Sequence, residues 1–94
     1  MQISYDPAKR AQTLALRGID MAHAGEVFAR SSITTADDRF DYGEPRFITV
    51  GFLRGRMVLV AWTPRDDSVR IISMRKANAR EIARFGPKLR DDAG

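Results

Sequence analysis

Residues 46–76 read RFITVGFLRGRMVLVAWTPRDDSVRIISMRK and contain three apolar runs separated by short polar segments. The runs are rich in β-branched and aromatic residues, which is typical of strands. They are Arg46–Leu53, Arg56–Thr63 and Val69–Arg75. Because the connections Arg54-Gly55 and Pro64–Ser68 are short, this stretch predicts three neighbouring antiparallel strands.

The residues before this stretch predict a short strand and two helices. Apolar residues alternate with polar ones over residues 1–5, as they do in strands. Asp6 followed by a proline is typical of a helix start and Gly18 of a helix end, so residues 7–17 are expected to be helical. Asp20 can cap a second helix over residues 21–30.

The remaining segments complete an α+β pattern. Residues 31–36 predict a short strand, and the acidic residues 37–45 predict a solvated loop. Glu81 follows Asn78 at the spacing of a capping box, so a last short helix is expected before Gly86. Residues 87–94 are expected to be a polar tail. The order predicts one domain over residues 1–94, with its core at about 2–86 and helices packed on a small, mainly antiparallel sheet.

The composition excludes several classes of function. The chain has no cysteine and one histidine, His23, which argues against disulfides, thiolate zinc sites and histidine-based triads. We therefore expect no metal and no cofactor. No apolar run approaches the roughly 18 residues of a membrane span, and no signal-peptide pattern begins the chain, so a cytoplasmic protein is expected.

The basic residues concentrate in the C-terminal half. Residues 1–45 contain five Lys or Arg against seven Asp or Glu, whereas residues 46–94 contain eleven against five. Thirteen of the sixteen basic residues are arginine, whose guanidinium binds phosphate through two hydrogen bonds at once. The charge therefore favours a polyanionic partner such as RNA, although a solvated arginine-rich surface explains the same composition.

The C-terminal half resembles the BrnT family of ribonuclease toxins from type II toxin–antitoxin systems. The resemblance rests on Arg46 at a strand start, the hairpin Gly51–Trp62, Thr63 with Arg65, the block RIISMRKANARE at Arg70–Glu81, and Phe85. The opening YDPAK at Tyr5–Lys9 also resembles the family's. The likeness covers roughly residues 4–86, and the RIISMRKANARE block is its most specific part.

This resemblance implies a RelE-like fold, in which N-terminal helices and a short C-terminal helix pack on an antiparallel sheet that carries a basic cleft. It also implies metal-independent cleavage of mRNA that inhibits translation and growth, which in RelE-like toxins the ribosome can assist. The implied partner is an antitoxin, typically of the ribbon-helix-helix DNA-binding type, in a toxin–antitoxin assembly that can be of higher order.

The candidate site residues are arginines with one lysine and one acid. The catalytic candidates are Arg46, Arg65, Arg75 and Glu81, and the RNA-binding candidates are Arg17, Arg70 and Lys76. Guanidinium groups stabilise the charge that develops on a phosphate during cleavage, so these arginines are expected to converge on one pocket. Arginine is a poor base, because its pKa exceeds about 12, so Glu81 and Glu44 are the candidate proton acceptors.

Two positions depart from the family pattern. The family usually has Lys-His before the glycine that ends the first helix, where this chain has Leu16-Arg17. A family tyrosine is replaced by Phe85. Slow intrinsic cleavage is therefore expected. The alternative function is a catalytically weak or inactive toxin-fold binding module that partners an antitoxin in operon autoregulation.

Structural roles compete with functional ones at the same residues. Arg75 and Lys76 can simply close a strand, and Glu81 can serve only as a helix cap. Trp62 suits the core as well as it suits base stacking. Arg70 can pair with a neighbouring acid, and it lies five residues from Arg75. In a regular strand this odd separation puts the two arginines on opposite faces, so they can share a cleft only if the strand is bulged or one of them lies past its end.

A structural reading is equally open for two residues of the N-terminal half. His23 falls among helical core positions and is expected to be a half-buried packing residue. Arg17 can bind phosphate, but at the end of a helix it can equally interact with the helix dipole.

Overall fold

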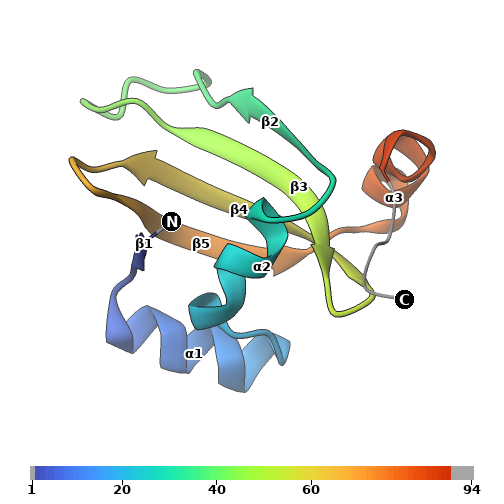
Figure 1. The fold of residues 1–94 in the computed structure, drawn as a ribbon, viewed down its shortest axis with the longest axis horizontal. Coiled ribbons are helices and arrows are strands. Elements are labelled where there is room, and N and C mark those ends of the chain that lie inside the picture. Colours follow the sequence, from blue (N-terminus) through green and yellow to red (C-terminus); the bar gives the residue numbers. More distant parts are fainter. Residues whose placement is uncertain (1, 90–94) are drawn as a thin grey trace.

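A five-stranded mixed sheet organises the computed structural model, which describes residues 2–89 (Figure 1). The expectations for residue 1 and for residues 90–94 of the predicted tail lie outside the described residues. The elements in chain order are β1 (Gln2–Ser4), α1 (Pro7–Arg17), a 3-10 turn (Met21–His23), α2 (Ala24–Phe28), β2 (Ser32–Ala36), β3 (Phe47–Leu53), β4 (Arg56–Pro64), β5 (Ser68–Lys76), α3 (Ala79–Phe85) and a second 3-10 turn (Gly86–Lys88).

The strands lie in the order β1-β5-β4-β3-β2. The predicted antiparallel pairing of the three long strands is confirmed, because β3 pairs with β4 and β4 with β5 in antiparallel register. The strand expected at residues 31–36 is also confirmed as β2, which pairs antiparallel with β3. Only β1 is parallel to its neighbour, β5. The fold class is therefore α+β, as the order of elements predicted, and the sheet is mixed because β1 is parallel to β5.

The N-terminal helices cover one face of the sheet (Figure 1). Asp6 caps α1 by accepting a hydrogen bond from the Ala8 amide, and Gly18 ends it with φ 69°, so both predicted ends are confirmed. The main hydrophobic core lies beneath these helices. Its buried residues are Ile19, Met21, Ala24, Val27, Leu53, Val58, Val60, Ile71 and Met74.

The second helix is shorter than expected. A helix over residues 21–30 was predicted, but the chain forms a 3-10 turn and then five residues of α2. Asp20 accepts a hydrogen bond from the Ala22 amide and so caps the tight turn. Gly25 has a low helix propensity, and the chain has to leave the helix before it enters β2.

Trp62 belongs to the core side of the sheet. Its ring stacks on Phe47 with centroids 4.9 Å apart and meets Phe28 edge-on at 5.7 Å. Its Nε1–H donates to the hydroxyl of the buried Thr49 at 2.8 Å. The indole is therefore committed to packing, in agreement with the structural interpretation of this residue.

On the opposite face of the sheet, a helix covers one end only. There α3 and the second 3-10 turn cover the sheet. Phe85 of α3 and Leu89, which follows the turn, pack in one cluster with Val50 and Met57. Leu89 is 8% exposed, which corrects the expectation that the polar tail begins at residue 87. The turn over Gly86–Lys88 brings this leucine back to the sheet. The rest of this face carries no helix among the described residues, and we call it the open face.

A bulge in β5 determines which side chains reach the open face. In the register with β4, Ala61 is opposite Ser73 and Trp62 is opposite Ile71, so Ile72 has no opposite residue. The extra residue reverses the alternation of faces within the strand. Arg70 and Arg75 consequently share the open face, and the bulge is one of the two conditions under which they were expected to do so.

We predict that Gly51→Ala destabilises the protein. A Cβ at this position would lie 2.9 Å from Cγ1 of Val27 and 3.2 Å from Cβ of Ser32, because α2 packs directly on β3 here. Such overpacking typically costs about 1–3 kcal/mol, measurable as a lower free energy of unfolding in urea. Gly25→Ala is the matched control, since its Cβ would meet nothing within 4 Å. Equal losses in both variants would contradict this account of Gly51.

Candidate functional site

A pocket of about 170 Å³ lies on the open face. Its floor is formed by Ile48, Leu59, Ala61 and Ser73 from the three long strands, and its sides by Arg39 and Arg75. A larger hollow of about 360 Å³ occurs on the helix-covered side, around Leu14 and His23. Two arginines border each hollow, and at the larger one they are Arg54 and Arg56. The smaller pocket is the better candidate for phosphate chemistry, because no acid lines it, whereas Asp20 lines the larger hollow.

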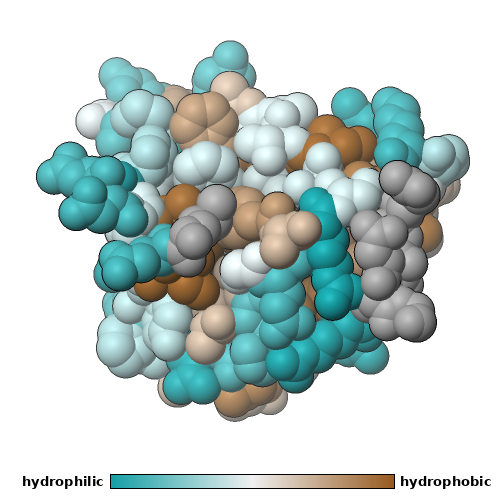
Figure 2. Space-filling view, in the orientation of Figure 1, coloured by the Kyte–Doolittle hydropathy of each residue, from teal (hydrophilic) through white to brown (hydrophobic). Residues whose placement is uncertain are grey.

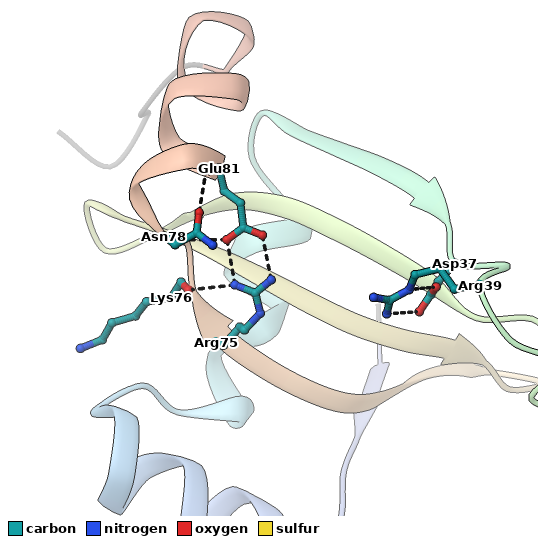
Figure 3. A network of polar contacts seen from close by, with 6 residues as sticks. All are labelled: Asp37, Arg39, Arg75, Lys76, Asn78 and Glu81. Carbon is teal, nitrogen blue, oxygen red and sulfur yellow. Dashed lines mark hydrogen bonds and ion pairs between the residues drawn. The ribbon is translucent and has the colours of Figure 1, made fainter.

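Arg75 is held in a fixed orientation by Glu81 (Figure 3). Its Nη1 donates to Glu81 Oε1 at 2.8 Å, and its Nη2 donates to Oε2 at 2.7 Å. The Arg75 Nη1 also donates to the Lys76 carbonyl at 3.3 Å. The ion pair therefore joins the end of β5 to the first turn of α3.

Glu81 also forms the predicted capping box. Its Oε1 accepts a hydrogen bond from the Asn78 amide at 2.9 Å, and its own amide donates to Asn78 Oδ1 at 2.8 Å. The hydrogen bonds from Arg75 lower the pKa of Glu81 to about 2, which outweighs the opposing effect of desolvation. A carboxylate with so low a pKa is a weak base at neutral pH. Its contacts suit it to starting the helix and orienting Arg75.

The contacts of Arg75 leave one edge of its guanidinium available. A guanidinium has five N–H donors, and those that contact Glu81 and the Lys76 carbonyl lie at its Nη1–Nη2 end. The Nε–H and one Nη2–H have no partner among the described residues. In Figure 3 this edge faces the side of the sheet on which Arg39 lies. Two parallel N–H groups on one edge are the geometry that binds two oxygens of a phosphate.

Arg39 is a site residue that was not expected from the sequence. The residues between β2 and β3 predicted only a solvated loop, yet Asp37 is buried and binds Arg39 through both carboxylate oxygens, at 2.8 and 3.1 Å. Tyr42 donates a further hydrogen bond to Asp37 at 3.3 Å. No pattern in the sequence indicates that this loop folds over the open face, because its position depends on contacts with other parts of the chain.

Arg65 and Arg46 lie at the other end of the sheet from Arg75. Arg65 is in the β4–β5 turn, where its Nη1 is 3.4 Å from Glu44 Oε1. Arg75 is seven residues along β5 from Ser68, and this length of strand spans roughly 23 Å. Arg65 therefore does not converge with Arg75 as expected, because a hairpin turn and the far end of its strand are separated by the length of the strand. Arg46 lies at the turn end as well, since it precedes Phe47, which is opposite Trp62 near the end of β4.

Arg46 and Arg70 flank the turn end of the open face. Arg46 directly precedes β3, and its Cζ lies 3.8 Å above the ring centroid of Tyr42. Its Nε is buried and has no hydrogen-bond partner among residues 2–89. Arg70 lies opposite Thr63, and within the same residues it forms no ion pair with a neighbouring acid.

Arg17 and Lys76 do not line the pocket. Arg17 ends α1 and donates a hydrogen bond from Nη1 to the Met74 carbonyl at 2.8 Å, beside a groove between α1 and β5. The Lys76 side chain extends away from Arg75 in Figure 3. His23 is half-buried and lies on the helix-covered side, as a packing residue would.

The helix-covered side, seen in Figure 2, is mainly hydrophilic, with separate apolar areas. Leu14 and Leu16 of α1 are exposed, at 44% and 75%. None of the described helices is long and apolar enough to cross a membrane. In the part of the chain that the structure describes, no three His, Asp or Glu residues are grouped so that they could hold a metal ion.

A comparison with protein families identifies the chain. Residues 5–81 match the family model described as the ribonuclease toxin BrnT of type II toxin–antitoxin systems. The chain belongs to the BrnT family. The match includes the strands that form the pocket, together with Arg39, Arg75 and Glu81. A search of curated proteins found no match to the chain. BrnT membership implies a ribonuclease toxin with an antitoxin partner.

We predict that the contribution of the Arg75–Glu81 pair to stability depends on pH. The pKa of Glu81 is about 2 in the folded chain and 4.5 ordinarily, so the contribution is present above about pH 4.5 and disappears as the pH falls towards 2. Glu81→Gln keeps a capping side chain but removes the charge. It should lower the free energy of unfolding by up to about 1 kcal/mol near neutral pH, because the pair is partly exposed.

Urea unfolding near neutral pH and near pH 3 checks this expectation. The difference between wild type and Glu81→Gln should shrink at the lower pH. Asp66→Asn removes the same charge from the β4–β5 turn and serves as the control. A difference that stays constant with pH would refute the assignment of the effect to this ion pair.

Proposed function

We propose that this BrnT-family chain is a RelE-like, metal-independent endoribonuclease that cleaves mRNA at the open-face pocket and so inhibits translation and growth in the cytoplasm. The single observation that carries the proposal is the free Nε–Nη2 edge of Arg75 beside that pocket. The family match supports ribonuclease activity. The pocket supports a specific place for it, since its apolar floor and its fixed cation suit a nucleotide.

RNA can be cleaved by its own 2′-hydroxyl. The 2′-oxygen attacks the adjacent phosphorus, the bond from phosphorus to the 5′-oxygen breaks, and a 2′,3′-cyclic phosphate and a 5′-hydroxyl result. The 2′-hydroxyl must lose a proton, and the leaving 5′-oxygen must gain one. In the proposed site Arg75 stabilises the negative charge that builds up on the non-bridging oxygens.

Proton transfer is the weak part of this site. Glu81 is a poor base because of its low pKa, and His23 lies on the other side of the sheet. Catalysis in the proposed site therefore relies on charge stabilisation and on the position of the substrate. Slow cleavage of free RNA follows, with faster cleavage where the ribosome orients the mRNA.

The alternative function is a toxin-fold binding module with little or no cleavage, which partners an antitoxin in operon autoregulation. One observation favours it, since no side chain that lines the pocket has an ordinary pKa near neutrality. RNA binding with a steep dependence on salt but without cleavage would support this alternative.

We propose that the antitoxin, of the ribbon-helix-helix type, neutralises the toxin by covering the open face. The family match supports the existence of the partner, and the uncovered pocket beside α3 supports the place. A complex of this kind stabilises the toxin by linkage, so its melting temperature should rise with the partner present.

We predict that Arg75→Ala lowers RNA cleavage by about a hundredfold or more, because it removes a charged hydrogen-bond donor from the developing phosphorane. Arg65→Ala is the matched control, since Arg65 is also paired with a glutamate but lies in the distant turn. Purified variants are compared on single-stranded RNA, and growth and mRNA integrity are followed after induced expression. If Arg75→Ala remains as toxic as wild type, or if only Arg65→Ala is inactive, the pocket is not the active site.

A further inference from the structure

A second guanidinium, that of Arg39, borders the pocket opposite Arg75. Both line the same space, with Leu59 and Ala61 of β4 between them. Hydrogen bonds that Arg75 donates to Glu81 raise the pKa of Arg75, and the positive charge of Arg39 opposes that rise. The two cations therefore influence one another directly, although they are distant in the sequence.

Asp37, in the loop between β2 and β3, holds the side chain of Arg39 in place. Asp37 accepts hydrogen bonds from its Nε and Nη2, and the Asp37 amide donates to the Arg46 carbonyl at 2.8 Å. The side chain of Asp37 is 3% exposed, whereas that of Arg39 is 68% exposed. The acid is thus buried and fixed by the backbone and by Tyr42, while the cation is presented to the surface.

The contacts of Arg39 complement those of Arg75. Asp37 uses the Nε–Nη2 edge of Arg39, which leaves Nη1 and the remaining Nη2–H without a partner among the described residues. In Figure 3 the Nη1 of Arg39 points away from Asp37, towards the side of the sheet where Arg75 lies. Each arginine therefore keeps one complete edge of N–H donors, and the two edges lie on opposite sides of one pocket.

We propose that Arg39 binds the RNA phosphate next to the one bound by Arg75. The RNA chain then crosses β3, β4 and β5, between the β2–β3 loop and α3. The proposal rests on the proposed function of this pocket. One free edge matches the two non-bridging oxygens of one phosphodiester, so two edges fit two neighbouring phosphates. The apolar floor between them, with Ile48 and Leu59, receives the intervening nucleoside.

Binding to a short single-stranded oligoribonucleotide with 2′-O-methyl groups tests the proposal, because this probe cannot be cleaved through its 2′-oxygen. Fluorescence anisotropy is measured with the full chain over a range of salt concentrations. Loss of one phosphate contact makes the slope of log affinity against log salt shallower by about 0.7 for a single strand. Arg39→Ala and Arg75→Ala should each show this change and bind several-fold more weakly.

Arg54→Ala is the matched control. Arg54 is also an exposed arginine paired with an acid, Glu26, at 3.0 Å, but it lies in the turn between β3 and β4 and borders the hollow on the helix-covered side. The variant changes the net charge by the same amount as Arg39→Ala. Its salt slope should equal that of wild type.

Asp37→Asn separates orientation from charge. This variant makes the chain more positive, so a general attraction between protein and RNA would strengthen. The proposed role of Asp37 is to orient Arg39, so we expect weaker binding instead. Unchanged melting temperatures of the Arg39 and Asp37 variants show that the fold is retained.

The outcomes distinguish this proposal from the function on which it rests. If Arg39→Ala behaves as Arg54→Ala does while Arg75→Ala binds weakly, Arg39 is not a phosphate ligand, and the proposed function stands. If wild type does not bind the probe and none of the variants differs from it, both proposals are overturned. Stronger binding by Asp37→Asn would likewise show that Arg39 acts only through the overall charge.

Discussion

The ion pair between Arg75 and Glu81 links three parts of the molecule. It fixes the end of β5, it involves the carboxylate that caps α3, and it leaves a defined edge of the guanidinium beside the pocket. Because one carboxylate starts the helix and orients the arginine, the helix cannot shift without changing the pocket. The low pKa of Glu81 follows from the same geometry, so this acid holds its charge at the pH of a cell.

The face of the sheet to which Arg70 points depends on the bulge at Ile72. Val69, Ile71 and Met74 all pack in the main core, although Ile71 and Met74 are three positions apart in the strand. An unbroken alternation would bury Ser73 with Ile71 instead. The neighbouring pair Ile71-Ile72 therefore signalled the bulge in the sequence, since it interrupts the alternation of apolar and polar residues. A bulge was one of two ways in which Arg70 and Arg75 were expected to share a face, and its position was not predicted.

Features that depend on a few neighbouring residues could be predicted, and features that depend on distant contacts could not. The caps of α1 and α3 follow from Asp6, Gly18 and Asn78, whose effects are local. The position of Arg39 depends on the contact of its loop with the start of β3, and the burial of Leu89 depends on a turn that returns the chain to the sheet. The separation of Arg65 from Arg75 became clear only with the strand register.

The hydrogen bond from Arg17 to the Met74 carbonyl affects how the molecule can meet other chains. β1 pairs with only Ser68–Arg70 of β5. Among the described residues, the rest of β5 has no strand beside it on that side. An exposed edge of this kind invites an extra strand from another polypeptide. On this side of β5, the charged side chain of Arg17 donates a hydrogen bond to the Met74 carbonyl, and α1 lies beside the strand. Because this carbonyl already accepts a hydrogen bond, an added strand would have one backbone acceptor fewer to pair with.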